Sequence, residues 1–377
     1  MQQRVVPLWA AAGASQTRPV RRVVLAVVHS VASGMRVVDA VAAIEGTAGV
    51  QVVFTRPPGP DDNGVDRFLD GLDAITTPWE RAVRERFDLV VAADPTGTGV
   101  LRGALLLVPA ISSAGVLVDH RGCDCVPALR RAVRKLRATQ RPDPLVIGLP
   151  HTDDIDELLF AAPDVAQHAA VVGDTGYDTL LAAVRHREAY RVRLGVRPHQ
   201  RLGLVVSAEG PESVLGASPA LIDRVATDFP LQGDRVLCYL HPDVWVGHGR
   251  RQVLSWMSEA TRCRVQFLRP EFDWRVAVVA ADYIIGDGGS LTAYAAAVGK
   301  PVYLANPLRA PEHGSVGSLL ARYSTVLSPD RPLRPQIDLR QVDPSALARR
   351  ITSAPGGSAD ALRAASLRLL RLTDPAA

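Results

Sequence analysis

The residues best suited to chemistry form a glycine-rich turn, Asp287-Gly288-Gly289-Ser290, which stands between an apolar run and a helical pattern. The run Asp282–Ile285 predicts a short strand, and Ser290 or Thr292 can cap a helix that extends to about residue 298. Such a turn leaves backbone N–H groups directed out of the helix end, which makes an anion site, most often for phosphate. Glycines suit this role because a side chain would hold the ligand away from the backbone. The alternative is an ordinary turn between a strand and a helix that binds nothing.

Two further polar clusters follow predicted strands in the same part of the chain. Ser207, with Glu209 and Gly210, follows the strand predicted over residues 202–207, and His241 follows the strand predicted over residues 235–240. The carboxyl ends of parallel strands lie on one edge of a doubly wound sheet. We therefore expect these residues to converge with the glycine-rich turn.

This combination of residues suits a diphosphate. The helix dipole and its N–H groups would take one phosphate, while His241 and Ser290 donate to others. The alternative for His241 is a structural histidine held by Pro242. Asp287 is expected to cap or orient the turn rather than act as a base, because a free carboxylate beside a phosphate is repulsive. The predicted site, without a metal ion, consists of Ser207, Glu209, His241, Asp287, Gly288, Gly289, Ser290 and Thr292.

Short apolar runs alternate with helical patterns along the whole chain. The first run, Arg22–Val28, is typical of a strand buried on both faces of a parallel sheet. The alternation predicts an α/β fold with two Rossmann-like doubly wound parallel-sheet domains facing a cleft. The expected division is a flexible leader over residues 1–20, an acceptor domain over 21–175, a nucleotide-donor domain over 176–335, and C-terminal helices over 336–377, the last of which can return to the first domain.

Length and composition fit a soluble protein of two domains. The chain has 377 residues, of which 47% are hydrophobic and 22% are charged. No apolar run approaches the roughly 20 residues that a membrane span needs. Residues 1–20 lack the order of a signal peptide, and the 4 cysteines lack the spacing of a zinc site and are expected to be free thiols. These features predict a cytoplasmic protein that requires no cofactor.

The charge balance is only mildly basic. The net charge of +4 comes from 43 basic and 39 acidic residues and does not by itself indicate nucleic-acid binding, so no nucleic-acid partner is expected. The densest basic run, residues 130–137, has Leu129, Val133 and Leu136 at helical spacing, which predicts an amphipathic helix with a basic face. A solvated face is the favoured interpretation. Contact with an anionic polymer, or peripheral contact with the inner membrane face, is the alternative.

The order of the motifs resembles the C-terminal half of GT-B nucleotide-dependent transferases, in particular the CDP-glycerol glycerophosphotransferase family. Residues 172–180 resemble the "G-x-P-R-x-D-x-L" linker segment of that family, and His241-Pro242 resembles its His-Pro pair. Residues 281–290 resemble its "A-D-x-L-I-T-D-Y-S-S", and Lys300-Pro301 its "K-P".

This resemblance covers about residues 170–305. UDP-N-acetylglucosamine 2-epimerases are similar in the same glycine-rich turn, and the whole chain resembles a group of actinobacterial proteins of similar length. The resemblance implies that His241, Ser290 and Thr292 contact a nucleotide diphosphate.

The first domain departs from the glycerophosphotransferase pattern. That family carries an "H-G-T-P-x-K" segment whose His is assigned as the base, whereas the matching residues 107–115 contain no His. The Pro-Arg of the linker segment is also replaced. A base is then expected from His29, which ends the first strand at the edge facing the cleft, or from Asp94, His120 or His151. His29 and Asp94 are the catalytic candidates, and the alternative for His29 is a polar strand terminus.

Three functions are consistent with these observations. The first is a GT-B-type transferase that moves a glycosyl or glycerophosphate-type group from a CDP- or UDP-linked donor to an unknown acceptor. The second is a non-catalytic GT-B-like binding or scaffold protein, which the missing first-domain His favours. The third is an enzyme like a UDP-sugar epimerase or hydrolase. It would need several carboxylates in the cleft, where the first domain offers few beyond Asp94.

Overall fold

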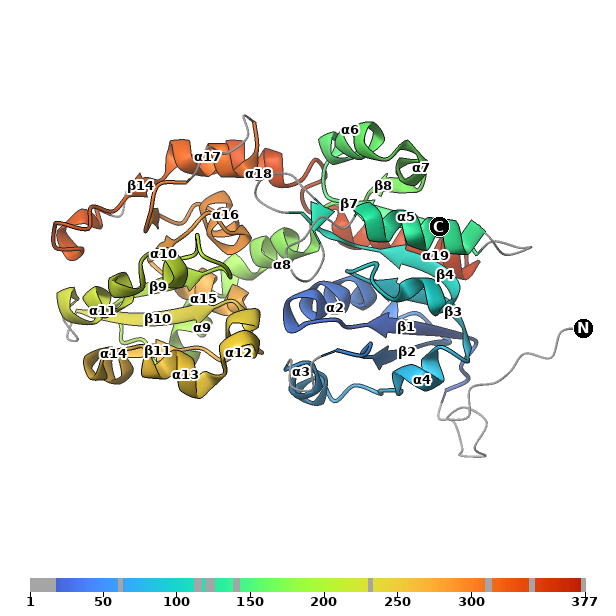
Figure 1. The fold of residues 1–377 in the computed structure, drawn as a ribbon, viewed down its shortest axis with the longest axis horizontal. Helices are drawn as coiled ribbons and strands as arrows, with labels where there is room; N and C mark the ends of the chain where they lie inside the picture. Colours follow the sequence, from blue (N-terminus) through green and yellow to red (C-terminus); the bar gives the residue numbers. More distant parts are fainter. Residues whose placement is uncertain are drawn as a thin grey trace, which may run out of the picture. The chain divides into compact units, whose positions relative to one another are not determined.

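The protein consists of two compact units, each of which is an α/β layer structure (Figure 1). The computed structural model describes residues 18–59, 64–111, 117–118, 126–137, 143–229, 233–308, 314–338 and 343–373. The first unit contains the described residues up to Ile111, those in Leu117–Gly176 and those from Ser353 onward, and the second contains those in Tyr177–Thr352. Most of the expected leader and His120 lie outside the described residues.

The first unit is built on six parallel strands in the order β2-β1-β3-β4-β7-β8. These strands are β1 (Arg22–Val27), β2 (Val50–Thr55), β3 (Arg86–Ala92), β4 (Arg102–Leu107), β7 (Leu145–Leu149) and β8 (Ala169–Val171). In register, Leu25 of β1 pairs with Val53 of β2 on one side and with Val90 of β3 on the other. Because helices cover both faces of the sheet, side chains of both strand faces are buried.

Helices and one short hairpin complete the first unit. They are α2 (Val31–Glu45), α3 (Val65–Gly71), α4 (Trp79–Ala82), η1 (Thr98–Val100), α5 (Val126–Arg137), α6 (Thr152–Ala161), α7 (Pro163–Ala166), α19 (Ser358–Leu370) and the antiparallel pair β5 (Ala110–Ile111) and β6 (Leu117–Val118). The C-terminal helix α19 packs against α2, and Arg363 Nη1 donates to the carbonyl oxygen of Ala43 at 3.2 Å. The last helix of the chain therefore lies in the first unit, in the same layer of helices as α2.

The second unit has six parallel strands in the order β11-β10-β9-β12-β13-β14. They are β9 (Arg201–Ser207), β10 (Asp234–Leu240), β11 (Val265–Phe267), β12 (Tyr283–Gly286), β13 (Val302–Leu304) and β14 (Thr325–Val326). The chain moves outward from β9 in one direction and then restarts at β12 on the other side, so the topological switch point lies between β9 and β12. The predicted α/β fold with two Rossmann-like doubly wound parallel sheets is confirmed.

The helices that accompany the strands of the second unit are short. They are α8 (Thr175–Ala183), η2 (Val184–His186), α9 (Arg187–Arg193), α10 (Val214–Ala217), α11 (Pro219–Asp228), α12 (Pro242–His248), α13 (Arg250–Ser255), α14 (Glu259–Arg264), α15 (Trp274–Ala280), α16 (Ser290–Ala297), α17 (Val316–Tyr323), η3 (Arg334–Gln336) and α18 (Ser345–Ile351). Helix α18 packs on α16 and α17, so the two C-terminal helices belong to different units. None of the helices in the described part of the chain has the length and apolar character required to cross a membrane.

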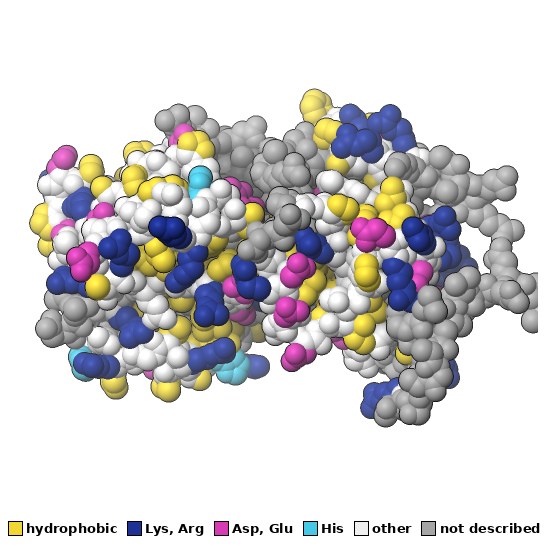
Figure 2. Space-filling model, turned by 60° about the horizontal axis from the view of Figure 1, so that its bottom comes forward, with side chains coloured by type: hydrophobic (Ala, Val, Ile, Leu, Met, Phe, Trp, Pro, Cys, Tyr) yellow, Lys and Arg dark blue, Asp and Glu magenta, His cyan; other side chains and the backbone are white. Residues whose placement is uncertain are grey.

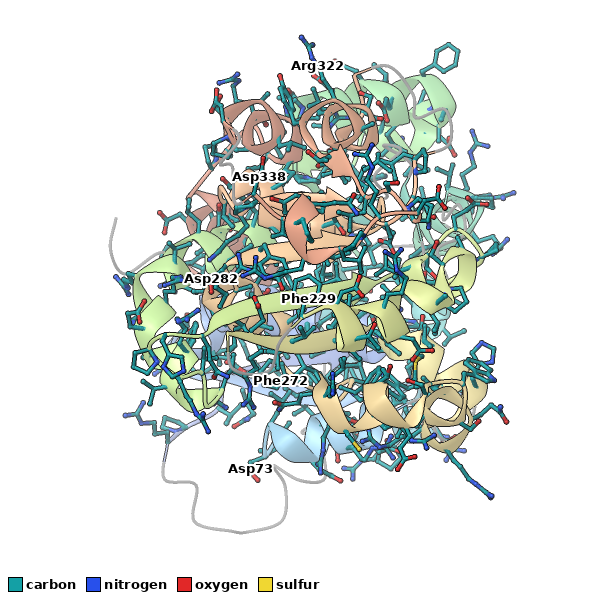
Figure 3. All side chains as sticks on the ribbon, turned by 90° about the vertical axis from the view of Figure 1, so that its left-hand side faces the viewer. Asp73, Phe229, Phe272, Asp282, Arg322 and Asp338 are labelled. Atoms are coloured by element: carbon teal, nitrogen blue, oxygen red, sulfur yellow. The ribbon has the colours of Figure 1, made fainter. Side chains whose placement is uncertain are left out.

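At the amino-terminal edge of the second sheet, Asp282 joins β12 to β9 and to α9 (Asp282 is labelled in Figure 3). Its Oδ2 accepts the backbone N–H of Leu202 at 2.7 Å and Nη1 of Arg191 at 2.9 Å. Nearby, Lys300 Nζ donates to two carbonyl oxygens at the end of α15, at 2.7 and 2.8 Å. Asp282 and Lys300, both part of the motifs quoted above, therefore hold the sheet together at the edge opposite the glycine-rich turn.

Candidate functional site

The glycine-rich turn connects the carboxyl end of β12 to α16, as predicted. Gly289 is the N-cap residue of α16, and no side chain caps this helix. The first N–H groups of a helix have no intrahelical acceptor, and here the N–H of Gly289 alone is taken by a side chain, that of Asp287 at 2.9 Å. The turn therefore presents the uncapped N-terminus of an eight-residue helix, in which the N–H groups and the dipole favour an anion.

The glycines at the end of β12 and in the turn have close neighbours within the protein. A Cβ atom on Gly289 would lie 2.9 Å from Oδ1 of Asp287, and one on Gly288 would lie 2.9 Å from Cδ2 of Leu308. One on Gly286, at the end of β12, would lie 2.3 Å from the Thr292 hydroxyl oxygen. Absence of side chains at these positions is thus explained by close contacts within the protein itself.

The side chain of Asp287 links two turns through hydrogen bonds, as its expected orienting role requires. Its Oδ2 accepts the N–H groups of Ala208 at 2.7 Å and Val214 at 3.2 Å, and its Oδ1 accepts that of Gly289. Burial raises the pKa of this carboxyl group, and the three N–H donors act in the opposite direction without cancelling the effect. Because its oxygens are bonded to the backbone on both sides of the switch point, Asp287 fixes the turn after β12 against the turn after β9.

Ser207 has a similar internal role. Its side chain is buried, its Oγ accepts the N–H of Leu215 at 3.0 Å, and it donates to the carbonyl oxygen of Ala208 at 3.1 Å. The N-terminus of α10 is consequently satisfied by side chains, because Ser213 Oγ also accepts from Gly216 at 3.0 Å. Ser207 supports the edge on which a ligand would sit, and its hydroxyl is already engaged in the protein.

The structure does not support the expectation that Thr292 contacts a ligand. Its side chain is fully buried beneath α16, at 0% exposure, and its hydroxyl lies against Gly286. A β-branched residue at the third position of α16 points toward the sheet, since that face of the helix packs on β12. Ser290, at the first position of the helix, is exposed.

His241 is held by Glu209 at the neighbouring strand ends. The His241 Nδ1 contacts Glu209 Oε2 directly, and it lies 3.7 Å from Asp243 Oδ2. Nδ1 also accepts the backbone N–H of Asp243 at 3.3 Å, so His241 is the N-cap residue of α12. Figure 2 shows one face of the molecule, on which basic side chains of the second unit are interspersed with apolar and uncharged ones.

The pKa values of this pair move in opposite directions. Burial alone would lower the pKa of His241, but the hydrogen bond and charge of Glu209, with the charges of Asp243 and Asp287, raise it above its ordinary value. Burial alone would raise the pKa of Glu209, but His241 holds it below the usual range. Both shifts favour an imidazolium paired with a carboxylate.

Glu209, His241 and Asp243 also have the spacing of a metal site, since their ligand atoms lie within 4.8 Å of one another. A metal ion would bind Nδ1 through its lone pair. In this structure Nδ1 contacts a carboxylate oxygen of Glu209 directly, and the pKa of His241 is raised while that of Glu209 is lowered. The arrangement accordingly fits a hydrogen-bonded ion pair. Asp243 was not among the predicted residues, although its position two residues after a strand-terminal histidine could have indicated it.

The catalytic candidates of the first unit lie together at its own switch point. His29 follows β1 and Asp94 follows β3, which are adjacent strands. His29 is 6% exposed and its Nε2 donates to the carbonyl oxygen of Thr96 at 2.7 Å, while Asp94 is fully buried and its Oδ1 accepts the N–H of Thr96 at 2.6 Å. Both side chains are thus hydrogen-bonded to the loop after β3. The contact of His29 with Thr96 fits the alternative given for it, a polar strand terminus.

One polar residue at the candidate edge was not predicted. Asn306 stands two residues after β13, next to the turn that follows β12, and its Oδ1 accepts from Ser218 Oγ at 2.6 Å. Its amide nitrogen is buried without a hydrogen-bond partner among the described residues. The same carboxyl-end argument that selected His241 could have selected Asn306, because the strand before it is short and ends at residue 304.

Comparisons with known proteins place the fold in the GT-B class. No protein-family model matches the sequence, and no curated protein matches it. The structure is similar to that of the wall teichoic acid polymerase TagF, with a TM-score of 0.56 at 10% identity over 93% of this chain and 90% of that chain. It is also similar to UDP-GlcNAc 2-epimerase from Methanocaldococcus jannaschii, with a TM-score of 0.53 at 11% identity over 92% of this chain and 98% of that chain. The predicted GT-B architecture is thereby confirmed at the level of the fold.

Proposed function

We propose that the second unit binds the diphosphate of a CDP- or UDP-linked donor at the N-terminus of α16, and that the protein is a GT-B-type transferase. The transferred group would be of the glycosyl or glycerophosphate type. The observation that carries the proposal is the contrast between helix ends at one sheet edge. Side chains cap α10, α12 begins at Pro242 with His241 as its cap, and α16 alone among these three lacks a side-chain cap.

Similar proteins bind ligands of this chemistry. TagF is described as a wall teichoic acid polymerase and has been soaked with CDPG, and the archaeal relative in fold is a UDP-GlcNAc epimerase. At 10–11% identity these names carry no residue assignment to this chain. They support a nucleotide-linked ligand. The features of the proposed site are suited to the diphosphate of such a ligand, and they do not select the base or the transferred group.

In the proposed reaction the leaving group is the nucleotide phosphate. The N–H groups of Ser290 and Leu291, with the dipole of α16, would stabilise the negative charge that develops on it, and they need no reorganisation to do so. His241 stands two strands away, at roughly 10 Å given the usual spacing of strands, which a diphosphate with a hydrogen bond at each end can bridge. No metal ion is required in this scheme.

We propose that the first unit binds the acceptor, and we name no residue of this unit as the base. Burial of His29 and Asp94 favours a second candidate function, a GT-B-like protein that binds a nucleotide-linked ligand without catalysing transfer. Turnover of a donor into free nucleotide in the presence of acceptor preparations distinguishes the two.

Peripheral contact with the inner membrane face is a further proposal and depends on α5, in which Leu129 and Val133 are buried while Arg131 and Arg134 are exposed.

The donor site is tested by the backbone N–H at the first helical position. Proline is well tolerated there, and Gly289 has φ −72° and ψ 167°, the extended conformation that a residue before proline prefers. Ser290→Pro therefore removes one N–H donor while preserving the helix, and Ser290→Ala is the matched control that keeps it.

Binding is followed by thermal shift with CDP-glycerol, UDP-glucose, UDP-GlcNAc, GDP-mannose and ADP-ribose. A ligand at 100 times its Kd adds about 2.7 kcal/mol of apparent stability. We expect a shift with a CDP- or UDP-linked compound that falls about tenfold in affinity in Ser290→Pro and less in Ser290→Ala. No shift with any compound, or equal binding by the two variants, contradicts the proposed site.

A further inference from the structure

Ser218 stands where a serine normally caps a helix, but its hydroxyl group is used elsewhere. It is the N-cap residue of α11, and its side chain makes no hydrogen bond to that helix. Its Oγ instead donates to Oδ1 of Asn306 at 2.6 Å, between two residues that are 88 positions apart in the chain. The bond joins the start of α11, on the segment that follows β9, to the end of β13. The hydroxyl that could cap α11 therefore holds the amide of Asn306.

This bond decides which branch of the Asn306 amide is left over. Because Oδ1 accepts from Ser218, the amide nitrogen is the remaining branch, and it carries two N–H donors. The nitrogen is buried and has no hydrogen-bond partner among the described residues. Buried polar groups in folded proteins nearly always have a partner, since an unsatisfied donor lowers stability. Asn306 is thus an oriented donor whose acceptor none of the described residues supplies.

The register of the sheet places Asn306 beside the glycine-rich turn. The strands β12 and β13 are paired to their ends, where the N–H of Ala305 donates to the carbonyl oxygen of Gly286 at 2.8 Å. Continued past this bond, the register sets Asn306 opposite Gly288, at the usual strand spacing of about 5 Å. The chain stays close to the turn beyond this point, since a Cβ atom on Gly288 would lie 2.9 Å from Cδ2 of Leu308. Asn306 and the uncapped N-terminus of α16 are therefore neighbours at one sheet edge.

We propose that Asn306 is a binding residue of the donor site and that its amide nitrogen donates to a diphosphate oxygen of the donor. The inference rests on the proposed donor site and adds a side-chain donor to the backbone N–H groups of Ser290 and Leu291. Ser218 is a positioning residue, because it acts through Asn306 and its own hydroxyl proton is engaged with Oδ1. The amide nitrogen is covered in this structure, so neighbouring side chains move aside when the contact forms.

A phosphate oxygen is the acceptor that this position favours. The dipole of α16 and its first N–H groups attract an anion to the same turn. A hydroxyl group of the ribose or of the transferred group could also accept from the amide. Replacement of the amide by a carboxylate distinguishes the two, because a carboxylate repels a phosphate but accepts from a hydroxyl.

The test measures the Kd of UDP-glucose and of CDP-glycerol by calorimetry on the full chain and its variants. Asn306→Ala should weaken the nucleotide that binds the wild type by about tenfold, and Asn306→Asp should weaken it further, with an excess loss that shrinks as salt is raised. Asn306→Asp keeps an oxygen for Ser218, so its melting temperature should stay close to that of the wild type. Gln252→Glu, at an exposed position of α13, is the control for the added charge and should bind as the wild type does.

A double variant tests the role of Ser218. Ser218→Ala alone should lower the affinity by about threefold, and it should have no further effect when Asn306 is already alanine. Additive losses would reject the positioning role, because Ser218 would then act without Asn306.

The remaining outcomes separate this inference from the proposed function. A nucleotide that binds the wild type and both Asn306 variants equally rejects Asn306 as a binding residue. Full affinity in Asn306→Asp with a loss in Asn306→Ala assigns the contact to a hydroxyl and rejects the phosphate. Unchanged affinity with a large fall in melting temperature shows that the amide is needed by the fold alone. Absence of binding by the wild type rejects the donor site, and this inference with it. Asn306→Ala and the double variant decide the question even if Asn306→Asp does not fold.

Discussion

Asp287 Oδ2 accepts the backbone N–H of Ala208 at 2.7 Å, and this bond joins the turns that follow the two central strands of the second sheet. The strands β9 and β12 lie on the two sides of the topological switch point, where chain connections diverge and a ligand can approach the edge. A buried side chain that accepts from both turns keeps the uncapped N-terminus of α16 in a fixed position relative to the turn after β9, and β10, which His241 follows, lies on the other side of β9. The edge that carries the proposed site is therefore organised by a buried carboxylate.

Substitution of Asp287 is expected to lower stability strongly. Asp287→Ala leaves the N–H groups of Ala208, Val214 and Gly289 without an acceptor, and unsatisfied buried donors reduce the free energy of unfolding by about 1–3 kcal/mol each, with partial compensation by water. We expect a total loss of about 3 kcal/mol. Asp287→Asn retains one acceptor oxygen and should lose less.

Urea unfolding of the two variants measures this effect, with exposed Asp330→Ala as a matched control that should stay within about 0.5 kcal/mol of wild type. A loss in Asp287→Ala no larger than that of the control would show that the three N–H groups find other partners.

The buried hydroxyl of Thr292 predicts a stabilising substitution. Its Oγ1 is buried without a hydrogen-bond partner among the described residues, and the side chain is 0% exposed. Thr292→Val keeps the shape and removes the unsatisfied polar group, so the free energy of unfolding should rise by about 1 kcal/mol. Thr292→Ala, which removes a packed methyl group as well, should lower it by about 1 kcal/mol.

Ligand binding by Thr292→Val decides the functional question at this position. Because Thr292 lies under α16, we expect the affinity for a nucleotide donor to be unchanged. A loss of affinity in a variant that is at least as stable as wild type would restore Thr292 to the site that the sequence resemblance implied for it.

A larger side chain at Gly286 should be poorly tolerated. A Cβ atom there would lie 2.3 Å from the Thr292 hydroxyl and 2.7 Å from Cγ2 of Val206, both in a packed layer between α16 and the sheet. Gly286→Ala is expected to lower the free energy of unfolding by about 1–3 kcal/mol. Gly247→Ala, within α12 and with no atom within 4 Å of the added Cβ, is the control and should be neutral or stabilising.

Coupling at Gly286 can be measured directly. If the clash involves Thr292, the double variant Gly286→Ala with Thr292→Ala should be more stable than the sum of the two single effects predicts. Additive losses would place the strain at Val206 instead.

The sequence was informative about topology because the relevant signals are local. Continuous apolar runs such as Arg22–Val27 indicate parallel strands, and the carboxyl-end rule brought His241 and the turn after β12 to one edge. The residue roles were harder to predict because they depend on which way each side chain points. Ser207 and Asp287 form hydrogen bonds with the backbone of neighbouring turns. Ser290 and Thr292 are only two residues apart, but they lie on different faces of α16, and only Ser290 is exposed.

Burial also explains the outcome in the first unit. The sequence placed His29 at the end of the first strand, and the sheet order brings Asp94, which follows β3, next to it. Whether a strand-terminal side chain turns inward depends on the loops that cover it. The carbonyl and N–H of Thr96 hold both side chains inside. Long-range hydrogen bonds of this kind leave no periodic signal in a single sequence.

Lys300 gives the protein a pH-dependent stability that can be predicted in sign. Burial, followed by repulsion from Arg187, lowers the pKa of Lys300 to about 8. In the unfolded chain the pKa of a lysine is about 10.4, so between these values the unfolded state binds more protons. Stability contributed by this group is therefore present at high pH and is lost as pH falls through about 8.

The variant Lys300→Met isolates this contribution. The difference in free energy of unfolding between wild type and variant should change in favour of wild type as the pH rises from about 7.5 to about 9.5. Lys300→Arg, which keeps its charge throughout, should lack the same rise while retaining a cation near the carbonyl oxygens at the end of α15. Parallel pH profiles for wild type and Lys300→Met would show that the amine is as readily protonated in the folded protein as in the unfolded chain, and that the two carbonyl oxygens compensate fully for its burial.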